Sequence, residues 1–242
     1  MGFAITLAIG AIVAGAIAAV AGFGIGSILT PVIALHADTK AAVAAVSIPH
    51  LLGTMLRFWR LRKHVDRKVF SSFGVASAAG GLMGALLHAH AGSPALTALF
   101  GGLLVFAGVA GLTGFSGTMR FGTLSAYIAG TASGAFGGLV GNQGGIRSAA
   151  MLGFQIPKES FVATATAIAL IVDAVRMPVY FLTEGHRILA LWPAVSIATA
   201  GVVAGTLGGE KTLRRVPERL FRLLVSLIIL VLGLFELWQL RP

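Results

Sequence analysis

The chain contains no cysteine, and only eight of its 242 residues are acidic. The absence of cysteine excludes disulfide bonds, thiolate zinc sites and cysteine nucleophiles together. Charged residues make up 11% of the chain, whereas soluble domains contain roughly 25%. The sequence also lacks the HExxH and GxSxG motifs, so it offers few groups for general acid–base chemistry. We therefore expect no catalytic site and no cofactor.

The chain is instead rich in hydrophobic residues, which make up 57% of it and give a mean hydropathy of +0.93. Residues 70–88, 95–112, 190–208 and 220–240 each approach the ~20 apolar residues that cross a hydrocarbon core. The sequence predicts an all-α polytopic membrane protein, with residues 1–242 forming one transmembrane domain in the cell inner membrane. The N-terminal stretch is too rich in glycine for a cleaved signal peptide, so we expect it to belong to the mature structure.

Positive charge is concentrated in two short loops between apolar segments. The formal net charge is +10, and of the eighteen lysines and arginines six lie in residues 57–68 and five in residues 209–222. Loops of this composition mark the cytoplasmic ends of transmembrane helices, where anionic lipid attracts them. We therefore expect both loops to face the cytoplasm and membrane lipid, and we do not expect nucleic-acid binding.

The second half of the chain resembles the first at an offset of 119 residues. The matched pairs include Gly22 and Gly141, Gly26 and Gly145, Val43 and Val162, Ser47 and Thr166, and Arg57 and Arg176. The arginine pair is the most informative, because arginine is rare within membranes. We expect a duplication, with residues 1–119 and 120–242 as two repeats of about four membrane segments each.

Loop charge indicates how the two repeats are oriented. Residues 27–36 can span only about 15 Å as a helix, which is half a membrane, and residues 146–154 are equally short. If each short segment forms a re-entrant hairpin with the segment before it, each repeat makes three crossings and the repeats are inverted. Both basic loops then lie inside and both termini outside. Four full crossings per repeat would place the basic loop 209–222 outside, contrary to the positive-inside rule.

Each repeat contains a glycine-rich break in its first segment, G22-F-G-I-G-S27 and G137-G-L-V-G-N-Q-G-G145. A break at mid-depth would start a half-helix at Ser27 and at Ile146, with unpaired N–H groups and a positive dipole end that suit an anion. The alternative is that the glycines only allow close helix packing. The candidate substrate-binding residues in the breaks are Gly24, Gly26, Ser27, Asn142, Gln143, Gly144 and Gly145.

Five polar residues within apolar segments complete the candidate site. Arg147 would give an anion its charge partner, although it could instead pair with Asp173. His50 could hydrogen-bond substrate or carry a proton, or be a satisfied core histidine. The hydroxyls of Ser47 and Thr166 could bind an oxyanion or bond back to their own helices.

Two further arginines and the remaining histidines receive structural interpretations. Arg57 ends its helix beside a basic loop and is expected to mark topology. Arg176 lies three residues after Asp173 and could pair with it on one helix face, but its place near the helix end favours snorkelling toward the membrane surface. His88 and His90 are two residues apart, which is poor spacing for a metal pair on a helix. We therefore expect no metal site.

Four stretches together resemble the sulfite exporter TauE/SafE family, also called the toluene-sulfonate uptake permease family. They are GFGIGSILTPVIAL (22–35), SIPHLLGTMLRFWRLRKHVD (47–66), SGAFGGLVGNQGGIRSAAML (133–152) and FVATATAIALIVDAVRMPVYF (161–181). The resemblance covers nearly the whole chain. It implies an inner-membrane permease built from duplicated helix bundles, associated with small sulfur anions such as sulfite, sulfoacetate and related oxyanions.

Two classes of function follow. The first is a secondary transporter that binds a small anion at mid-membrane between the two breaks. The second is a non-transporting membrane scaffold or assembly subunit, in which the breaks only pack helices. The polar side chains of Asn142 and Gln143 favour the first, because packing alone does not require them. The expected partners are the anion and membrane lipid, and self-association into a homo-oligomer stays open.

Overall fold

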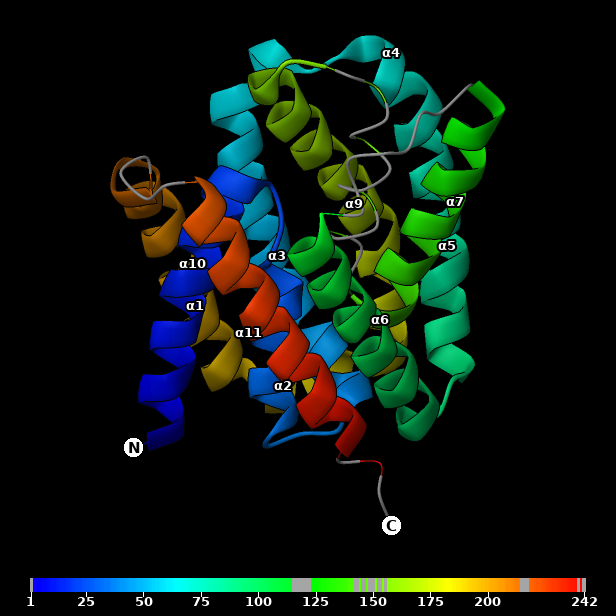
Figure 1. Cartoon of the computed structure of the whole chain (residues 1–242). Coiled ribbons are helices and arrows are strands. Elements are labelled where there is room, and N and C mark those ends of the chain that lie inside the picture. The colour runs from blue at the N-terminus through cyan, green and yellow to red at the C-terminus, as the bar shows by residue number, and fades with distance from the viewer. Residues whose placement is uncertain are drawn as a thin grey trace.

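The computed structural model describes residues 2–114, 123–141, 144, 147, 151, 154, 156–213, 218–238 and 240. The described residues form helices and no strand (Figure 1). In chain order the elements are α1 (Gly2–Ala21), α2 (Ile25–Ala34), α3 (Thr39–Leu61), η1 (Arg62–His64), α4 (Arg67–Val69), η2 (Phe70–Gly74), α5 (Val75–His90), α6 (Ser93–Thr113), α7 (Thr123–Val140), α9 (Lys158–Ala190), α10 (Trp192–Leu213) and α11 (Glu218–Trp238).

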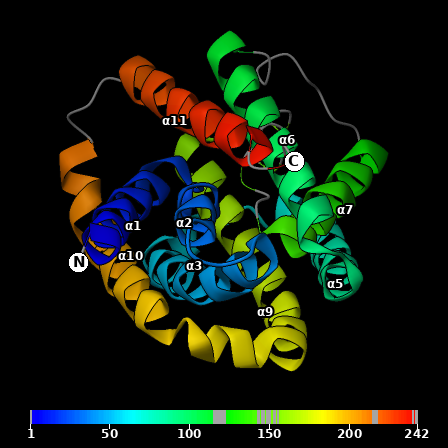
Figure 2. The ribbon, with the colours of Figure 1, turned by 90° about the horizontal axis from the view of Figure 1, so that it is seen from below.

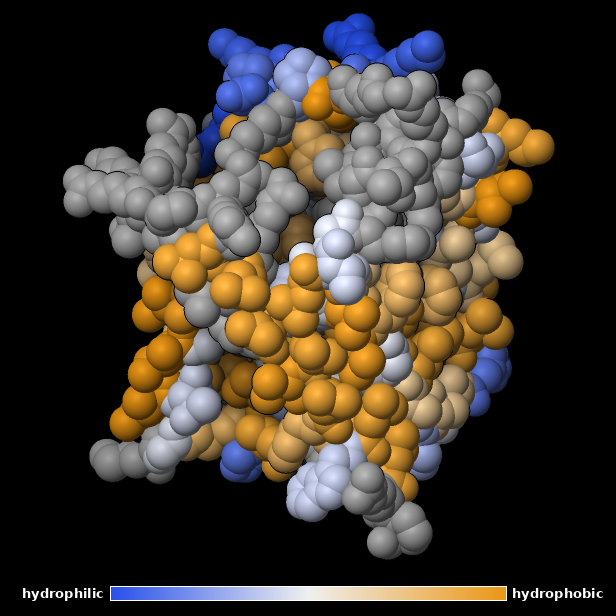
Figure 3. Space-filling model, in the orientation of Figure 1, coloured by the Kyte–Doolittle hydropathy of each residue, from blue (hydrophilic) through white to orange (hydrophobic). Residues whose placement is uncertain are grey.

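Within the described residues, six helical stretches are long and apolar enough to cross a membrane. They are Gly2–Val20, Thr39–His64, Arg67–His90, Ser93–Thr113, Glu159–Ala190 and Trp192–Gly209. Figure 3 shows hydrophobic residues over the middle of one face and hydrophilic residues toward its two ends. This pattern is what a lipid-embedded surface requires, and it confirms the prediction of an all-α polytopic membrane protein.

The helices pack in pairs around a central group. α1 packs against α10, α5 against α7, and α6 against α11, while α3 contacts α2, α9 and α10. Seen from below, the three pairs surround α2 and α3, and α9 lies beside α3 (Figure 2). The central helices α3 and α9 run in opposite directions. Thr164 near the start of α9 bonds the N–H of Asp66 beyond the end of α3, whereas Arg187 near the end of α9 pairs with Asp38 at the start of α3.

Helix pairs approach closely where glycines face a neighbouring backbone. A Cβ atom added to any of four glycines, two on α5 and two on α10, would collide with the paired helix: with its main chain at Gly80, Gly84 and Gly205, and with the Ala11 side chain at Gly201. Gly80 and Gly84 face Thr131 and Ala135 on α7, and Gly201 and Gly205 face Ala8 and Ile12 on α1. Both sets have the GxxxG spacing that brings small residues to one helix face, so the α1–α10 and α5–α7 pairs are held by van der Waals packing at short range.

The two ends of the molecule differ in charge. Both termini lie at one end, and α4 with its neighbouring basic loop lies at the other (Figure 1). The side chains of Arg60, Arg62, Lys63, Arg67 and Lys68 are exposed at this second end. At the first end, Asp38 and Lys40 at the start of α3 pair with Arg187 and Glu184 in the last turns of α9, so acidic and basic residues balance there.

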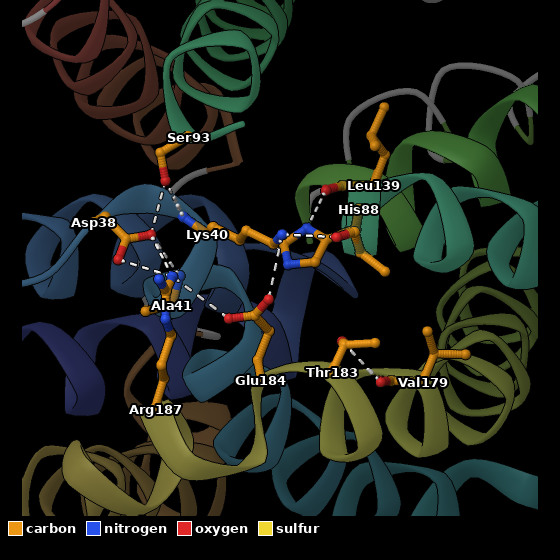
Figure 4. A network of polar contacts seen from close by, with 11 residues as sticks. Asp38, Lys40, Ala41, His88, Ser93, Leu139, Val179, Thr183, Glu184 and Arg187 are labelled. Atoms are coloured by element: carbon orange, nitrogen blue, oxygen red, sulfur yellow. Dashed lines mark hydrogen bonds and ion pairs between the residues drawn. The ribbon is translucent and has the colours of Figure 1, made fainter. Parts of the chain in front are cut away.

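That first end is held by a network of polar contacts (Figure 4). The Asp38 carboxylate pairs with Arg187 at 3.1 Å, accepts a hydrogen bond from Ser93 Oγ at 2.7 Å and caps α3 through the Ala41 N–H. Lys40 pairs with Glu184 at 3.3 Å. Partial burial alone would raise the pKa of Asp38, but the hydrogen bonds from Ser93 and Ala41 and the charge of Arg187 outweigh it and lower this pKa below its ordinary value.

The charge of the two ends predicts their orientation. Arg62 is exposed at the basic end and His186 at the opposite end, and the chain has no natural cysteine. We expect Cys at position 186 (His186→Cys) to react with an impermeant thiol reagent in intact cells, and Arg62→Cys to react only after the membrane is opened. Labelling of the Arg62→Cys variant from outside would show that the basic end faces outward and that the predicted orientation is wrong.

Glycine packing predicts a difference between two substitutions. Gly84→Val places its side chain against the Ala135 carbonyl, and we expect it to lower the free energy of unfolding by about 1–3 kcal/mol or more. Gly102 has nothing within 4 Å of an added Cβ, so Gly102→Val is the matched control and should change stability little. Thermal unfolding of the purified variants in detergent measures both, and equal melting temperatures would contradict the packing argument.

Candidate functional site

The first break separates α1 from α2 over three residues. Gly22 has φ 80° and Gly24 has φ 124°, backbone conformations that side chains with a Cβ rarely adopt. α2 begins at Ile25, so the predicted start at Ser27 was two residues late. Gly24, Gly26 and Ser27 are all buried. Gly24 is the N-cap of α2 and, having no side chain, makes no capping hydrogen bond. The backbone N–H groups of the first turn therefore need other partners.

The second break lies against the first. α7 ends at Val140, and Gly141 follows with φ 71°. A Cβ on Gly26 would lie 2.5 Å from the Gly141 carbonyl oxygen, and a Cβ on Gly144 would collide with the side chain of Phe23. The predicted site residues Asn142, Gln143 and Gly145, together with Ile146, lie outside the described residues. The structure thus brings one described part of each break into direct backbone contact.

Beside the breaks lies a buried cluster of ionisable side chains from three parts of the chain. α3 contributes His50 and Arg57, α9 contributes Asp173 and Arg176, and Arg147 follows the second break. The three arginines are between 1% and 3% exposed and Asp173 is 0% exposed. Burial of this kind is costly within a membrane protein and marks a functional-site hypothesis.

Asp173 is occupied by two neighbours. One carboxylate oxygen lies 2.7 Å from His50 Nδ1. The other accepts a hydrogen bond from Arg176 Nε at 2.9 Å and forms an ion pair with Arg176 Nη2 at 2.7 Å. Arg147 interacts with Asp173 through its charge, but its guanidinium bonds elsewhere. The expected alternative of an Arg147–Asp173 ion pair is therefore replaced by an Arg176–Asp173 pair.

Arg57 and Arg147 retain donors without partners. Arg57 donates from Nε to Thr166 Oγ1 at 3.0 Å, and Arg147 donates from Nη2 to the Gly22 carbonyl at 3.3 Å. Arg57 Nη1 and Arg147 Nε and Nη1 are buried and find no hydrogen-bond partner in the part of the chain that the structure describes. The charges of Arg57 and Arg147 repel each other, whereas the charge of Asp173 attracts Arg147. Two buried cations with free donors lie within electrostatic reach of each other.

Arg176 also fastens the second break. Its Nη1 donates to the Gly137 carbonyl at 2.7 Å, and the hydroxyl of Tyr180, one turn along α9, donates to the Gly138 carbonyl. Both carbonyls belong to the last turn of α7. The interpretations of Arg57 as a topology marker and of Arg176 as a snorkelling residue were wrong, because both side chains point into the protein and are buried.

The two candidate hydroxyls differ in their surroundings. Ser47 is buried and donates to the Ala44 carbonyl of its own helix at 2.5 Å. Thr166 donates to the Val162 carbonyl at 2.7 Å and accepts the bond from Arg57, so it orients a charged member of the cluster. Of the two, Thr166 is the one joined directly to the arginines.

Other features of the described chain lie away from this cluster. Two shallow hollows, lined mainly by apolar residues, are found on the outer helices, one along α11 at Leu234–Trp238 and one along α6 at Phe106–Thr113. Their lining suits lipid tails rather than an anion. Among the described residues no three His, Asp or Glu side chains gather in a way that would hold a metal ion.

Comparison with known proteins adds one finding. A family model described as "Sulfite exporter TauE/SafE" matches residues 7–235, nearly the whole chain. No curated protein and no solved structure gives a significant match.

The contact between the breaks predicts the effect of one added methyl group. Gly26→Ala places a Cβ 2.5 Å from the Gly141 oxygen, so the two breaks must separate, and we expect the free energy of unfolding to fall by about 1–3 kcal/mol. Gly10→Ala on α1 meets only Val32 at 4.0 Å and serves as the control. If both variants unfold at the same temperature as the parent protein, the breaks do not touch as described.

Proposed function

The chain belongs to the sulfite exporter TauE/SafE family, and from this premise we propose that it is a secondary transporter that moves a small anion, sulfite or an organosulfonate, across the cell inner membrane. The proposed binding site is the buried cluster of Arg57, Arg147 and Arg176 beside the two glycine-rich breaks. Three other candidate residues support these arginines: Thr166 bonds Arg57, Asp173 pairs with Arg176, and His50 contacts Asp173.

The observation that carries the proposal is the Arg57–Arg147 pair. Two guanidinium groups repel each other in a buried region, and together they retain three donor nitrogen atoms without partners. Guanidinium stays charged under all ordinary conditions, so the repulsion persists unless an anion lies between the two groups. An oxyanion would accept the free N–H groups and neutralise both cations.

Helix packing supports the proposal that residues 1–119 and 120–242 are repeats. At the offset of 119 residues, α1 corresponds to α7 and α5 to α10, and the pairs observed are α1 with α10 and α7 with α5. The space beside Gly22 is bounded by Val162, and that beside Gly141 by Val43, the matched residue of the other repeat. Such reciprocal contacts are what an approximate two-fold axis between the repeats produces.

Helix directions support the inverted form of this arrangement. Gly201 and Gly205 meet Ala8 and Ile12 in the same order, so α1 and α10 are parallel. Gly80 and Gly84 meet Thr131 and Ala135 in the same way, so α5 and α7 are parallel. Because α5 and α10 start from opposite ends of the molecule, α1 and α7 run in opposite directions (Figure 1).

Transport then follows from exposing one fixed site alternately to each side. The two repeats meet at the breaks, along α3 and α9 and within all three helix pairs, so the units that move would be bundles of paired helices and not whole repeats. A tilt of such a bundle would open the arginine cluster on one side at a time. The inside-negative membrane potential drives an anion outward by about 2.3 kcal/mol per charge per 100 mV. Export therefore needs no other source of energy.

The scaffold alternative explains the glycines but not the arginines. A protein that only packs helices gains nothing from buried cations that repel each other, since replacing such groups by apolar ones is often stabilising. The unpartnered donors of Arg57 and Arg147 favour transport for this reason.

Flux through proteoliposomes tests the proposed function. We expect the purified protein to move radiolabelled sulfite or an alkanesulfonate faster than protein-free liposomes. Arg57→Gln removes one cation from the cluster and should lower the flux by about tenfold or more. Lys63→Gln changes an exposed cation on the basic loop and should leave it nearly unchanged.

The two variants separate a local effect from a general one. Equal loss in Arg57→Gln and Lys63→Gln would mean that overall positive charge, not the buried cluster, attracts the anion. No flux above protein-free liposomes with either anion would favour the non-transporting alternative.

A further inference from the structure

We infer that the buried arginine cluster selects anions that carry two negative charges over singly charged anions of the same shape. This inference rests on the proposed function, because it specifies the charge of the anion that the proposed site takes. It follows from the number of buried charges and from the donors that lack partners.

The cluster has an excess of two positive charges at the least. Arg57, Arg147 and Arg176 contribute three and Asp173 removes one, while His50 counts as neutral. A proton on His50 or on Asp173 would only enlarge the excess, and guanidinium does not lose its proton in proteins. The value of two is therefore a lower limit that does not depend on how the cluster titrates.

Few other acidic groups are available to reduce this excess. The chain contains no Asp or Glu between residues 113 and 158, the whole stretch in which Arg147 lies. α3 has none from Thr39 to Leu61, and α2 has none either. On α9, Glu184 is engaged with Lys40 and Arg187 at the end of the molecule that holds both termini. Asp173 is thus the single carboxylate that faces the arginines among the described residues.

A doubly charged anion neutralises the excess of two positive charges, whereas a singly charged anion neutralises only half of it. Uncompensated charge is expensive where water is absent, so the second negative charge of the ligand is worth more here than in solution. A dianion also loses more hydration when it binds. Arg57 Nη1 and Arg147 Nε and Nη1 replace part of that hydration with fixed N–H donors, which need no reorganisation.

Two pairs of ligands of matched shape test the inference. Sulfoacetate and sulfoacetamide share the sulfonate and the chain length but carry two charges and one, and sulfate and methanesulfonate differ in the same way. We expect the dianion to bind the purified protein about tenfold or more tightly in at least one pair, measured by calorimetry at pH 8 in a buffer without competing small anions. Arg147→Gln and Arg57→Gln each lower the excess, so each should bring the two affinities of a pair closer together.

Controls distinguish the possible results. Lys63→Gln should keep the full preference for the dianion, and the thermal unfolding of every variant reports whether it is folded. Two results would overturn the inference but not the proposed function. One is equal affinity for the dianion and the monoanion in both pairs, and the other is a preference for the dianion that persists in Arg147→Gln and Arg57→Gln. If neither sulfite nor any of these four anions binds or crosses proteoliposomes, the proposed function falls and the inference falls with it.

Discussion

The arrangement around the described site depends on one carboxylate. Asp173 holds Arg176 and His50 at once, and so ties α9 to α3. Arg176 in turn binds the last turn of α7 through the Gly137 carbonyl. Without this carboxylate the cluster would hold three cations and no counter-charge, and a buried charge without a partner is strongly destabilising. A single acidic side chain therefore makes it possible to keep three guanidinium groups together in an apolar helix bundle.

The glycines and the charged cluster are two parts of one design. Close packing of α1 on α10 and of α5 on α7 allows the breaks to meet backbone to backbone. That contact leaves the Gly22 carbonyl at the surface of the cluster, where Arg147 binds it. A main-chain oxygen thus orients a guanidinium without adding another negative charge, so the excess of positive charge on which the proposed anion site depends is kept. Bulky side chains in the breaks would have blocked this approach.

Composition and hydrophobic run length were enough to predict the helical membrane fold, because lipid leaves few other solutions for a backbone. Arg147, Asp173, His50 and Thr166 were recognisable as polar residues inside apolar segments, and the structure brings them together. The role of Arg57 was missed, and for Arg176 the pair with Asp173 was considered but snorkelling was preferred. Each stands near a point where a helix was expected to end, which locally favours snorkelling, and α9 continues to Ala190.

The partners of these two arginines lay beyond the reach of local patterns. Thr166 is 109 residues from Arg57, and Gly137 is 39 residues from Arg176, so the contacts depend on how helices pack and not on spacing along one helix. The match of Arg57 with Arg176 at the offset of 119 residues was the available signal. An uncommon residue that recurs at matched positions of two expected repeats is expected to lie near the axis between them. This expectation should have been preferred to the snorkelling role that a position near a helix end suggests.

The Asp38 carboxylate joins two structural tasks at one end of the protein. It caps the first turn of α3 and also ties that turn to Arg187 and Ser93 of other helices. Because its pKa is lowered in the folded protein, its contribution is present at neutral pH and disappears as acidification protonates the group. Acid therefore frays the start of α3 and releases its tie to α9 in the same step. In a strongly acidic medium the end of the protein that carries both termini would loosen as one cooperative unit, while the buried arginines keep their charge.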